Sequence, residues 1–276
     1  MLNLPIKLFN MQNKVVIVTG ASSGIGEQLA KGFGRLGARV VLAARNYEKL
    51  VLFEKDFDPE SVLSVKTDVS KENECKALIE KTVEKFGRID ILINNAGLSM
   101  RALFEEMDLS VMKKLMDINF YGTVYCTKFA LPYLLESKGS VVGVSSIAGY
   151  KGLPGRAGYS ASKFAMQGFL EVLRIENMKK GLHVLIACPG FTASNIRNTS
   201  LTADGTAQGE SPRNEDKMMT SEEVAEKIIQ AISKRKHRLT LTTQGKMTVI
   251  LNKFFPKFMD KMVYNHMAKE PNSPFK

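Results

Sequence analysis

Tyr159 and Lys163 are two side chains that together could move a proton to or from an alcohol oxygen. On a helix, positions i and i+4 lie on the same face. A free tyrosine loses its proton at about pH 10 and is a poor base at neutrality. A lysine ammonium beside it lowers that pKa, which suits tyrosine to acid–base work on an alcohol. A serine upstream, Ser145 or Ser146, could hold the substrate oxygen. A bare Y-x-x-x-K pair also occurs on ordinary helix surfaces, so this interpretation depends on the other motifs.

The segment TGASSGIG, residues 19–26, is a glycine-rich turn of the kind that binds phosphate. Its glycines permit a close backbone approach, and a helix that starts here offers free N–H groups to a pyrophosphate. It is not a P-loop, because Glu27 and Gln28 stand where that motif needs Lys and Ser or Thr. Between a strand and a helix, the turn predicts a dinucleotide site formed by Gly20, Ser22, Ser23, Gly24, Ile25 and Gly26.

Hydrophobic periodicity predicts the elements that position these residues. Short runs rich in Val and Ile are typical of strands buried on both faces, at residues 14–19, 39–44, 62–67, 89–94, 140–145 and 183–188. Apolar stripes at helical spacing occupy residues 25–36, 48–57, 71–86, 110–135 and 159–180. The alternation predicts an α/β fold, a single-domain Rossmann-type doubly wound parallel sheet with helices on both faces. Ligands bind such sheets outside the carboxyl ends of the strands, where the motifs fall.

The chain changes character after Cys188. A polar stretch with little periodicity spans about residues 190–220 and leaves two interpretations, a substrate loop that closes over the site or a disordered segment. Residues 220–223 have the pattern of a capping box that opens a helix ending near Lys234. Residues 238–243 are typical of a last strand, and we place the end of the Rossmann-type domain at residue 245.

The remaining residues, 246–276, form a basic amphipathic segment. Residues 234–276 carry ten Lys or Arg against two acidic residues, a balance of +8, whereas the other 233 residues total only +3. Because the excess is confined to the tail, we expect no nucleic-acid partner. The apolar residues of a terminal helix from Gly245 could pack on the domain, on a second subunit or on a membrane surface. The sequence leaves all three open.

Composition predicts the compartment and the absence of a metal. Cys75, Cys126 and Cys188 are too few and too scattered for a disulfide framework or zinc site, and apolar neighbours indicate core positions. No histidine has metal-ligand spacing. The first residues show no signal-peptide pattern, and no apolar run approaches the ~18 residues of a membrane-spanning helix. We expect a soluble cytoplasmic protein, with peripheral contact to a membrane left open.

The motifs occur in a characteristic order: TGASSGIG at 19–26, NNAG at 94–97, an asparagine at 119, serines at 145 and 146, YSASK at 159–163 and PG at 189–190. Each motif is common alone. As a set, over residues 14–243, they resemble the short-chain dehydrogenase/reductase family. Within that family the sequence is similar to NADPH-dependent carbonyl reductases of the hydroxysteroid-dehydrogenase type.

The resemblance implies the catalytic roles. Tyr159 is the general acid–base, and Lys163 lowers its pKa and binds the nicotinamide ribose. Asn119 holds a water in the proton relay. The serine of the family stands thirteen residues before the tyrosine, which selects Ser146 and assigns Ser145 to the end of the strand.

The resemblance also implies the cofactor contacts. Asn94 and Ala96 stabilise the sheet and line the cofactor, with Asn95 and Gly97 beside them. The remaining implied contacts are Asp68 and Val69 at the adenine, Pro189 and Gly190, and Thr192 and Ser194 at the nicotinamide amide. The family more often has threonine at the position of Ser194.

The end of the second strand predicts which nicotinamide is used. Ala44 stands where NAD-specific relatives carry an acidic residue that binds both ribose hydroxyls, and Arg45 follows it. Arginine offers a forked, permanently charged donor suited to a 2′-phosphate. We therefore expect NADP(H) in preference to NAD(H), the alternative being a solvated arginine at a strand end.

These features predict an NADP(H)-dependent oxidoreductase that interconverts a carbonyl and an alcohol by hydride transfer. On the family pattern the site is surrounded by apolar residues, which favour an apolar ketone or alcohol: Leu98, Met100, Ile147, Tyr150, Leu153, Pro154 and Phe191. The same residues could equally be packing, and steroid, lipid, sugar-derived and xenobiotic carbonyls all stay open. Two alternatives are a non-catalytic dinucleotide sensor, which predicts loss of catalytic residues that are all intact here, and a membrane-associated scaffold. Family members are often dimers or tetramers, so a homo-oligomer is expected.

Overall fold

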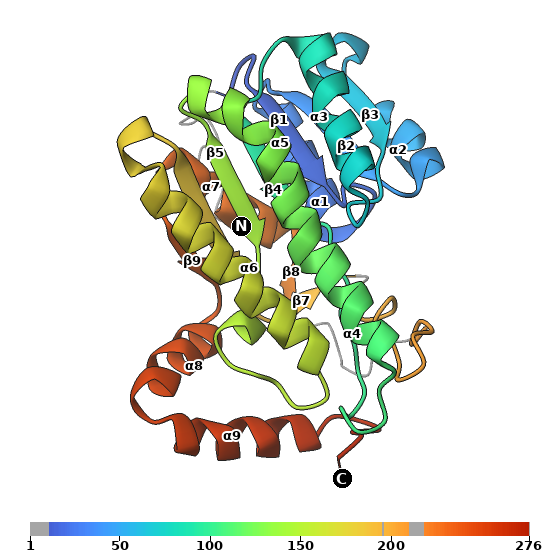
Figure 1. Ribbon diagram of the computed structural model, residues 1–276, viewed down its shortest axis with the longest axis vertical. Helices are drawn as coiled ribbons and strands as arrows, with labels where there is room; N and C mark the ends of the chain where they lie inside the picture. Colours follow the sequence, from blue (N-terminus) through green and yellow to red (C-terminus); the bar gives the residue numbers. More distant parts are fainter. Residues whose placement is uncertain (1–10, 195, 210–217, 276) are drawn as a thin grey trace.

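Seven parallel strands form a single sheet in the computed structural model, which describes residues 11–194, 196–209 and 218–275 (Figure 1). The strand order is β3-β2-β1-β4-β5-β6-β9. The strands are β1 (Val15–Thr19), β2 (Arg39–Ala44), β3 (Val62–Lys66), β4 (Ile91–Asn94), β5 (Ser140–Val144), β6 (His183–Cys188) and β9 (Arg238–Thr240). The chain winds outward from β1 to β3 and then continues on the other side of β1 with β4, so the winding reverses between β1 and β4. Such a reversal leaves a crevice at the carboxyl edge of the sheet.

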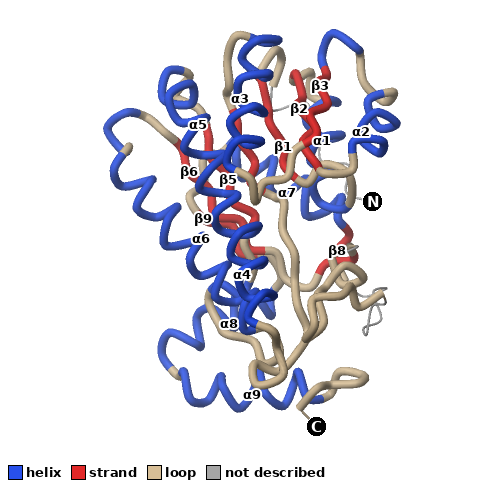
Figure 2. Tube along the Cα trace, turned by 45° about the vertical axis from the view of Figure 1, so that its right-hand side comes forward, coloured by secondary structure: helices blue, strands red, loops and turns tan. Residues whose placement is uncertain are grey.

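Helices cover both faces of this sheet, as Figures 1 and 2 show. One face packs against α1 (Gly24–Arg35) and α7 (Ser221–Ser233), and the other against α3 (Glu72–Phe86), α5 (Gly122–Glu136) and α6 (Ala157–Glu176). Alternate residues of β1 supply the two cores: Val16 and Val18 face α1 and α7, whereas Val15 and Ile17 face α3 and α5. Because both faces are buried, the strands are continuous apolar runs. The expected doubly wound α/β fold is confirmed.

The single helix expected over residues 110–135 is interrupted. Five residues, Asp117–Tyr121, form a π-helical turn between α4 (Leu109–Met116) and α5. Such turns widen the helix and are frequent at functional sites. Hydrophobic periodicity did not reveal the turn, because one extra residue barely shifts an apolar stripe of this length. Asn119 lies at the centre of the turn.

Two short strands, one near each end of the polar stretch after Cys188, pair with each other. Strand β7 (Thr192–Ala193) runs parallel to β8 (Met219–Thr220), and Leu201 bridges to Met100. The capping box at the start of α7 is confirmed, because the Thr220 hydroxyl accepts the Glu223 N–H and the Glu223 carboxylate accepts the Thr220 N–H. Residues 195 and 210–217 of the predicted substrate loop lie outside the described residues, and its closing over the site stays a prediction.

The terminal segment forms two helices instead of the single one expected from Gly245. Helix α8 (Thr243–Phe254) ends before Pro256, which opens α9 (Pro256–Ala268). Proline lacks the N–H that would continue a helix but fits the first position of the next one. The helices pack on the domain: the Asn252 amide donates to the Tyr150 carbonyl at 3.1 Å, and Asp260 pairs with Lys151. The boundary placed at residue 245 therefore falls inside α8.

The predicted core positions of the cysteines are confirmed, since Cys75, Cys126 and Cys188 are free and fully buried. Among the described residues, no group of His, Cys, Asp and Glu is placed to hold a metal ion. No helix in the described ranges is long and apolar enough to cross a bilayer.

Candidate functional site

A cavity of about 910 Å³ opens at the carboxyl ends of β1, β2 and β4, where the winding of the sheet reverses. We call it the glycine-loop cavity. The structure brings twelve of the predicted cofactor residues to its walls: Gly20, Ser22, Ser23, Gly24, Ile25, Arg45, Asp68, Val69, Asn95, Ala96, Gly97 and Ser194. These residues come from five separate stretches of sequence, so their convergence depends on the fold.

The turn after β1 owes its shape to contacts that only glycine permits. A Cβ on Gly26 would lie 2.3 Å from the Gly20 carbonyl oxygen, so a larger residue would displace the loop. The Thr19 hydroxyl accepts the N–H groups of Asn95 and Ala96, both at 3.0 Å, and the Asn95 side-chain amide donates to the Thr19 carbonyl at 2.9 Å. The loops after β1 and β4 are thereby held together. The sequence did not single out Thr19, because it is the last residue of a strand.

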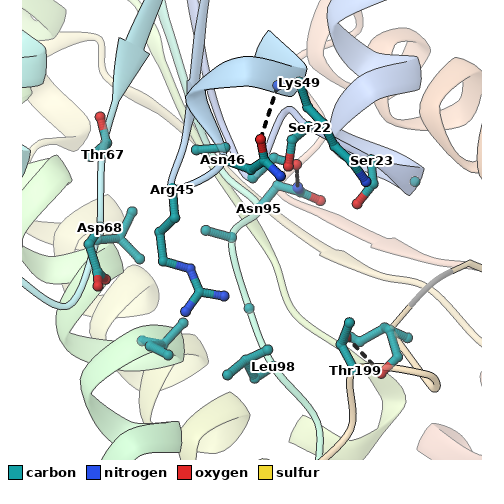
Figure 3. A pocket seen from close by; sticks show the side chains of 18 of the residues that line it. Ser22, Ser23, Arg45, Asn46, Lys49, Thr67, Asp68, Asn95, Leu98 and Thr199 are labelled. Carbon is teal, nitrogen blue, oxygen red and sulfur yellow. Dashed lines mark hydrogen bonds between the residues drawn. The ribbon is translucent and has the colours of Figure 1, made fainter. Parts of the chain in front are cut away.

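Positive side chains gather where β2 ends. Figure 3 shows Arg45 pointing into the glycine-loop cavity, which Lys49 and Lys66 also line. The Asn46 side chain accepts the Lys49 N–H at 3.0 Å and so caps α2 (Tyr47–Glu54). Ala44, which is buried, brings no carboxylate to this end of the strand. The sequence pointed to Arg45 but missed the two lysines and the cap. Two acidic side chains also line the cavity: Glu48 and Asp68.

A second cavity, of about 510 Å³, adjoins the first. The two share Ile25, Asn95, Gly97, Ser194 and Ile196 as lining residues, so they meet side by side. We call the second the tyrosine cavity. Its walls include the remaining predicted site residues, apart from Gly26 and Asn119: Ser146, Tyr159, Lys163, Pro189, Gly190 and Thr192.

Tyr159 and Lys163 lie on neighbouring turns of α6, but the lysine does not lower the pKa of the tyrosine as expected. The Lys163 ammonium donates to the Val144 carbonyl at 2.9 Å and lies 5.8 Å from the centre of the Tyr159 ring. Burial raises the pKa of Tyr159, against smaller lowering effects of the Ser146 hydroxyl and the Arg156 guanidinium. The net direction is upward, so Tyr159 is a neutral hydroxyl at physiological pH and can donate a proton.

The two serines at the end of β5 have different surroundings. The Ser146 hydroxyl lies near enough to Tyr159 to lower its pKa, and it accepts the Ala148 N–H at 3.2 Å. The Ser145 hydroxyl, nearly fully buried, accepts from the Gln167 side chain at 3.0 Å. The geometry therefore directs Ser146, and not Ser145, toward the tyrosine. Gln167 was missed, although it follows Lys163 by four residues on the same helix.

Asn119 is fully buried behind the cavities and is not one of their lining residues. Its side-chain oxygen accepts the Leu98 N–H at 2.8 Å, and its amide donates to the Leu98 carbonyl and the Ser162 hydroxyl, both at 2.9 Å. The side chain thus fixes the backbone that follows NNAG. The expected role of Asn119 in a water relay stays a prediction.

The residues expected around the substrate are only partly placed there. Ile147, Leu153 and Phe191 line the tyrosine cavity, whereas Leu98 lines the glycine-loop cavity. Three predicted residues are not at either wall: Met100, Tyr150 and Pro154. Met100 is fully buried and accepts the Gly158 N–H, and the Tyr150 hydroxyl accepts from Arg238. The family pattern does not reveal which side chains turn inward, and for these three residues the structure favours the packing alternative.

The opposite wall of the tyrosine cavity comes from α8 and α9. It is mostly apolar: Met247, Thr248, Leu251, Met259, Met262, Val263, His266 and Met267. Just beyond α9, the Glu270 carboxylate lies 3.6 Å from the Arg101 guanidinium and 3.7 Å from that of Arg156. All three side chains are largely buried. This cluster holds the end of the chain against the cavity, and the sequence gave no sign of it.

Lys163 should make stability depend on pH. Burial lowers its pKa from the usual 10.5 to about 8, and no carboxylate of the described residues pairs with it. Between these values the unfolded chain holds the proton that the folded chain has lost, so the free energy of unfolding rises with pH. Relative to Lys163→Met, the wild type should gain about 2 kcal/mol from about pH 7.5 to about pH 9.5. Denaturant titrations of both proteins at several pH values measure this gain in the free energy of unfolding. If the two free energies change with pH in parallel, the prediction is contradicted.

Comparison with known proteins identifies the family. The residue pattern of the short chain dehydrogenase family matches residues 14–204. The chain is 36% identical over 262 residues to a dehydrogenase/reductase SDR family protein 7-like of Dictyostelium discoideum, covering 92% of this chain and 81% of that protein. It is 34% identical over 273 residues to dehydrogenase/reductase SDR family member 7B of Rattus norvegicus, covering 95% of this chain and 84% of that protein.

A third relative is 11-beta-hydroxysteroid dehydrogenase 1A of Arabidopsis thaliana, 40% identical over 191 residues, which are 68% of this chain and 54% of that protein. Among solved structures, a short chain dehydrogenase/reductase from Burkholderia phymatum in complex with NAD has the same fold, with a TM-score of 0.81 at 23% identity over 91% of this chain and 96% of that one. The chain therefore belongs to the short-chain dehydrogenase/reductase family, whose members are oxidoreductases that interconvert carbonyl and alcohol groups with a nicotinamide dinucleotide.

Proposed function

We propose that this protein is an NADP(H)-dependent reductase of apolar ketones, with Tyr159 as its general acid–base. The observation that carries the proposal is the junction of the two cavities. The glycine-loop cavity has the volume that a dinucleotide needs, and Gly20 and Gly24 of the turn after β1 lie in its wall. The tyrosine cavity, which adjoins it, is lined by Tyr159 and Ser146 and by the mostly apolar wall of α8 and α9.

The chain's own residues would orient the substrate and protonate it. The bound nicotinamide would supply or accept the hydride. The Ser146 hydroxyl would hold the carbonyl oxygen, and the Tyr159 hydroxyl would give that oxygen its proton as negative charge develops on it. Lys163, which is buried one turn further along α6 and also lines the tyrosine cavity, would bind the ribose of the nicotinamide. The walls from α8 and α9 would keep bulk water away.

The lining of the tyrosine cavity supports a bulky apolar substrate. Leucine, methionine, valine and phenylalanine side chains line the cavity, and most of its surface is apolar although polar residues also contribute to the lining. One relative is named for a hydroxysteroid activity, and a rigid alicyclic ketone would suit such a cavity. We further propose that the enzyme is cytoplasmic and homo-oligomeric, and that cytoplasmic NADPH drives it toward reduction.

A carbonyl panel tests the proposal directly. Purified protein with NADPH should oxidise the cofactor, measured by loss of its absorbance, when given apolar cyclic ketones, and should respond weakly to sugar-derived carbonyls of similar size. The matched control replaces NADPH with NADH. Activity confined to polar carbonyls would contradict the substrate class, and no turnover with any carbonyl or alcohol would contradict the reaction.

The two serines provide an internal comparison. Ser146→Ala removes the hydroxyl that lies beside Tyr159, and we expect kcat to fall at least about tenfold. Ser145→Ala removes a hydroxyl that accepts from Gln167 and donates to the Lys163 carbonyl, so kcat should change by less than about threefold while thermal stability falls, since two buried hydrogen bonds are lost. Steady-state kinetics and melting curves measure both variants. The reverse ranking in kcat would show that Ser145 holds the substrate.

A further inference from the structure

The outer side of the terminal helices carries two exposed apolar stripes. On α8, Met247, Ile250 and Phe254 follow one another at i, i+3 and i+7, and therefore lie on one face. The same spacing recurs around α9 with Phe255, Phe258 and Met262. These six side chains are between 50% and 65% exposed. We call them the outer stripe. So much apolar surface gathered over two short helices is typical of an interaction site.

The outer stripe is not the side with which these helices pack on their own domain. That packing uses other residues: Gly245 lies against Ile147, Asn252 bonds to Tyr150, and Met259 is buried. Figures 1 and 2 show α8 and α9 projecting beyond the carboxyl edge of the sheet, at the bottom of the molecule. The stripe thus lies at one end of the molecule.

Lysines accompany the stripe in a regular pattern. Lys246, Lys253, Lys257 and Lys261 each directly precede one of its residues: Met247, Phe254, Phe258 and Met262. All four lysines are exposed. The only acidic residue between 243 and 269 is Asp260, which pairs with Lys151 of the domain. The surface is therefore apolar and cationic, with its one carboxylate already bound.

We propose that the outer stripe docks this protein on an anionic lipid surface. Phenylalanines between lysines suit the boundary of a bilayer, where rings enter the acyl region and ammonium groups meet anionic head groups. A second copy of the chain is a poorer occupant, because a two-fold contact would bring the same lysines of both copies together. The proposal is independent of the proposed reaction.

Docking in this way would place the tyrosine cavity at the lipid surface. Met247 and Met262 belong to the outer stripe and also line that cavity. Half-exposed residues that line a cavity form its rim, so the rim lies on the docking surface. An apolar substrate dissolved in the bilayer would then reach the cavity without crossing water.

Vesicle co-sedimentation of the full chain, without cofactor or substrate, tests the docking. Wild type should bind vesicles of phosphatidylcholine with about 30% phosphatidylserine, and bind vesicles of phosphatidylcholine alone at least about tenfold more weakly. Phe254→Ser/Phe255→Ser/Phe258→Ser should lower partitioning at least about tenfold. Lys253→Gln/Lys257→Gln/Lys261→Gln should remove most of the dependence on phosphatidylserine and on salt.

A matched control replaces equally exposed apolar residues elsewhere, as Leu52→Ser/Phe104→Ser/Leu109→Ser, and should bind vesicles like the wild type. None of the substituted residues lines either cavity, so far-UV circular dichroism and turnover of a water-soluble carbonyl should stay unchanged and report folding. Equal binding of wild type and the phenylalanine variant would overturn the proposal, as would no binding by wild type. A wild-type dimer in sedimentation velocity that this variant converts to monomer would assign the stripe to a subunit interface instead.

Discussion

Tyr159→Phe should lower turnover by about 100-fold or more, the range for losing a general acid–base group. The substitution removes the hydroxyl that lies beside Ser146 and keeps the ring. The ring packs against the core between the sheet and helices α3, α5 and α6. Because burial raises the pKa of Tyr159, the wild-type hydroxyl is protonated at neutral pH and ready to donate. Phenylalanine cannot donate, so the developing alkoxide would have to take its proton from water.

The loss should appear in kcat while cofactor binding is largely kept. Tyr159 lines the tyrosine cavity and not the glycine-loop cavity, so NADPH affinity, measured by fluorescence titration, should change by less than about threefold. Tyr125→Phe is the matched control, because Tyr125 lies on α5 outside both cavities. A Tyr159→Phe protein that retains more than about a third of wild-type turnover would rule out the mechanism, since a general acid is worth far more.

Wild-type protein should prefer NADPH to NADH by at least about tenfold in kcat/KM, equivalent to about 1.4 kcal/mol. Arg45 points into the glycine-loop cavity, and Lys49 and Lys66 line the same cavity. Three cations offer a 2′-phosphate more attraction than a ribose hydroxyl. No carboxylate stands at Ala44 to repel that phosphate.

The double variant Ala44→Asp/Arg45→Val should reverse the preference, so that the ratio of the two kcat/KM values changes by about 100-fold. It places a carboxylate where both ribose hydroxyls can donate to it and removes the guanidinium. Lys49→Gln alone tests how much a neighbouring cation contributes to the NADPH preference, and it should lower that preference by a smaller factor. If the wild type prefers NADH, or if the double variant keeps the wild-type preference, then Arg45 does not bind the 2′-phosphate of NADPH.

Most of the sheet could be predicted because its strands are buried on both faces. Burial on both sides makes each strand a continuous apolar run, and a turn or helix signal ends each run. The π-helical turn at Asp117–Tyr121 left no such trace, since one added residue keeps the apolar stripe nearly in phase. The break at Pro256 was readable in principle, but the apolar residues on both sides of it suggested one continuous face.

The candidate site was predictable where its residues sit in short motifs at strand ends. Parallel strands bring their carboxyl ends to one edge, so motifs far apart in sequence had to converge there. Contacts between distant side chains had no comparable signal. The pairing of Glu270 with Arg101 and Arg156 joins residues more than one hundred positions apart, and nothing in local composition indicates it. The pKa of Tyr159 was also misjudged, because spacing on a helix says nothing of where a lysine ammonium finds its acceptor.

The wall that α8 and α9 contribute to the tyrosine cavity lies outside the part of the chain that carries the family's residue pattern. The residue pattern shared by the family ends at residue 204, after the glycine loop and the tyrosine, whereas this wall comes from residues 244–270. Substitutions in the last thirty-odd residues can therefore reshape the space for the substrate without touching the residues that line the glycine-loop cavity. A chimera that exchanges only these last residues should therefore change the substrate selectivity and keep its host's cofactor preference.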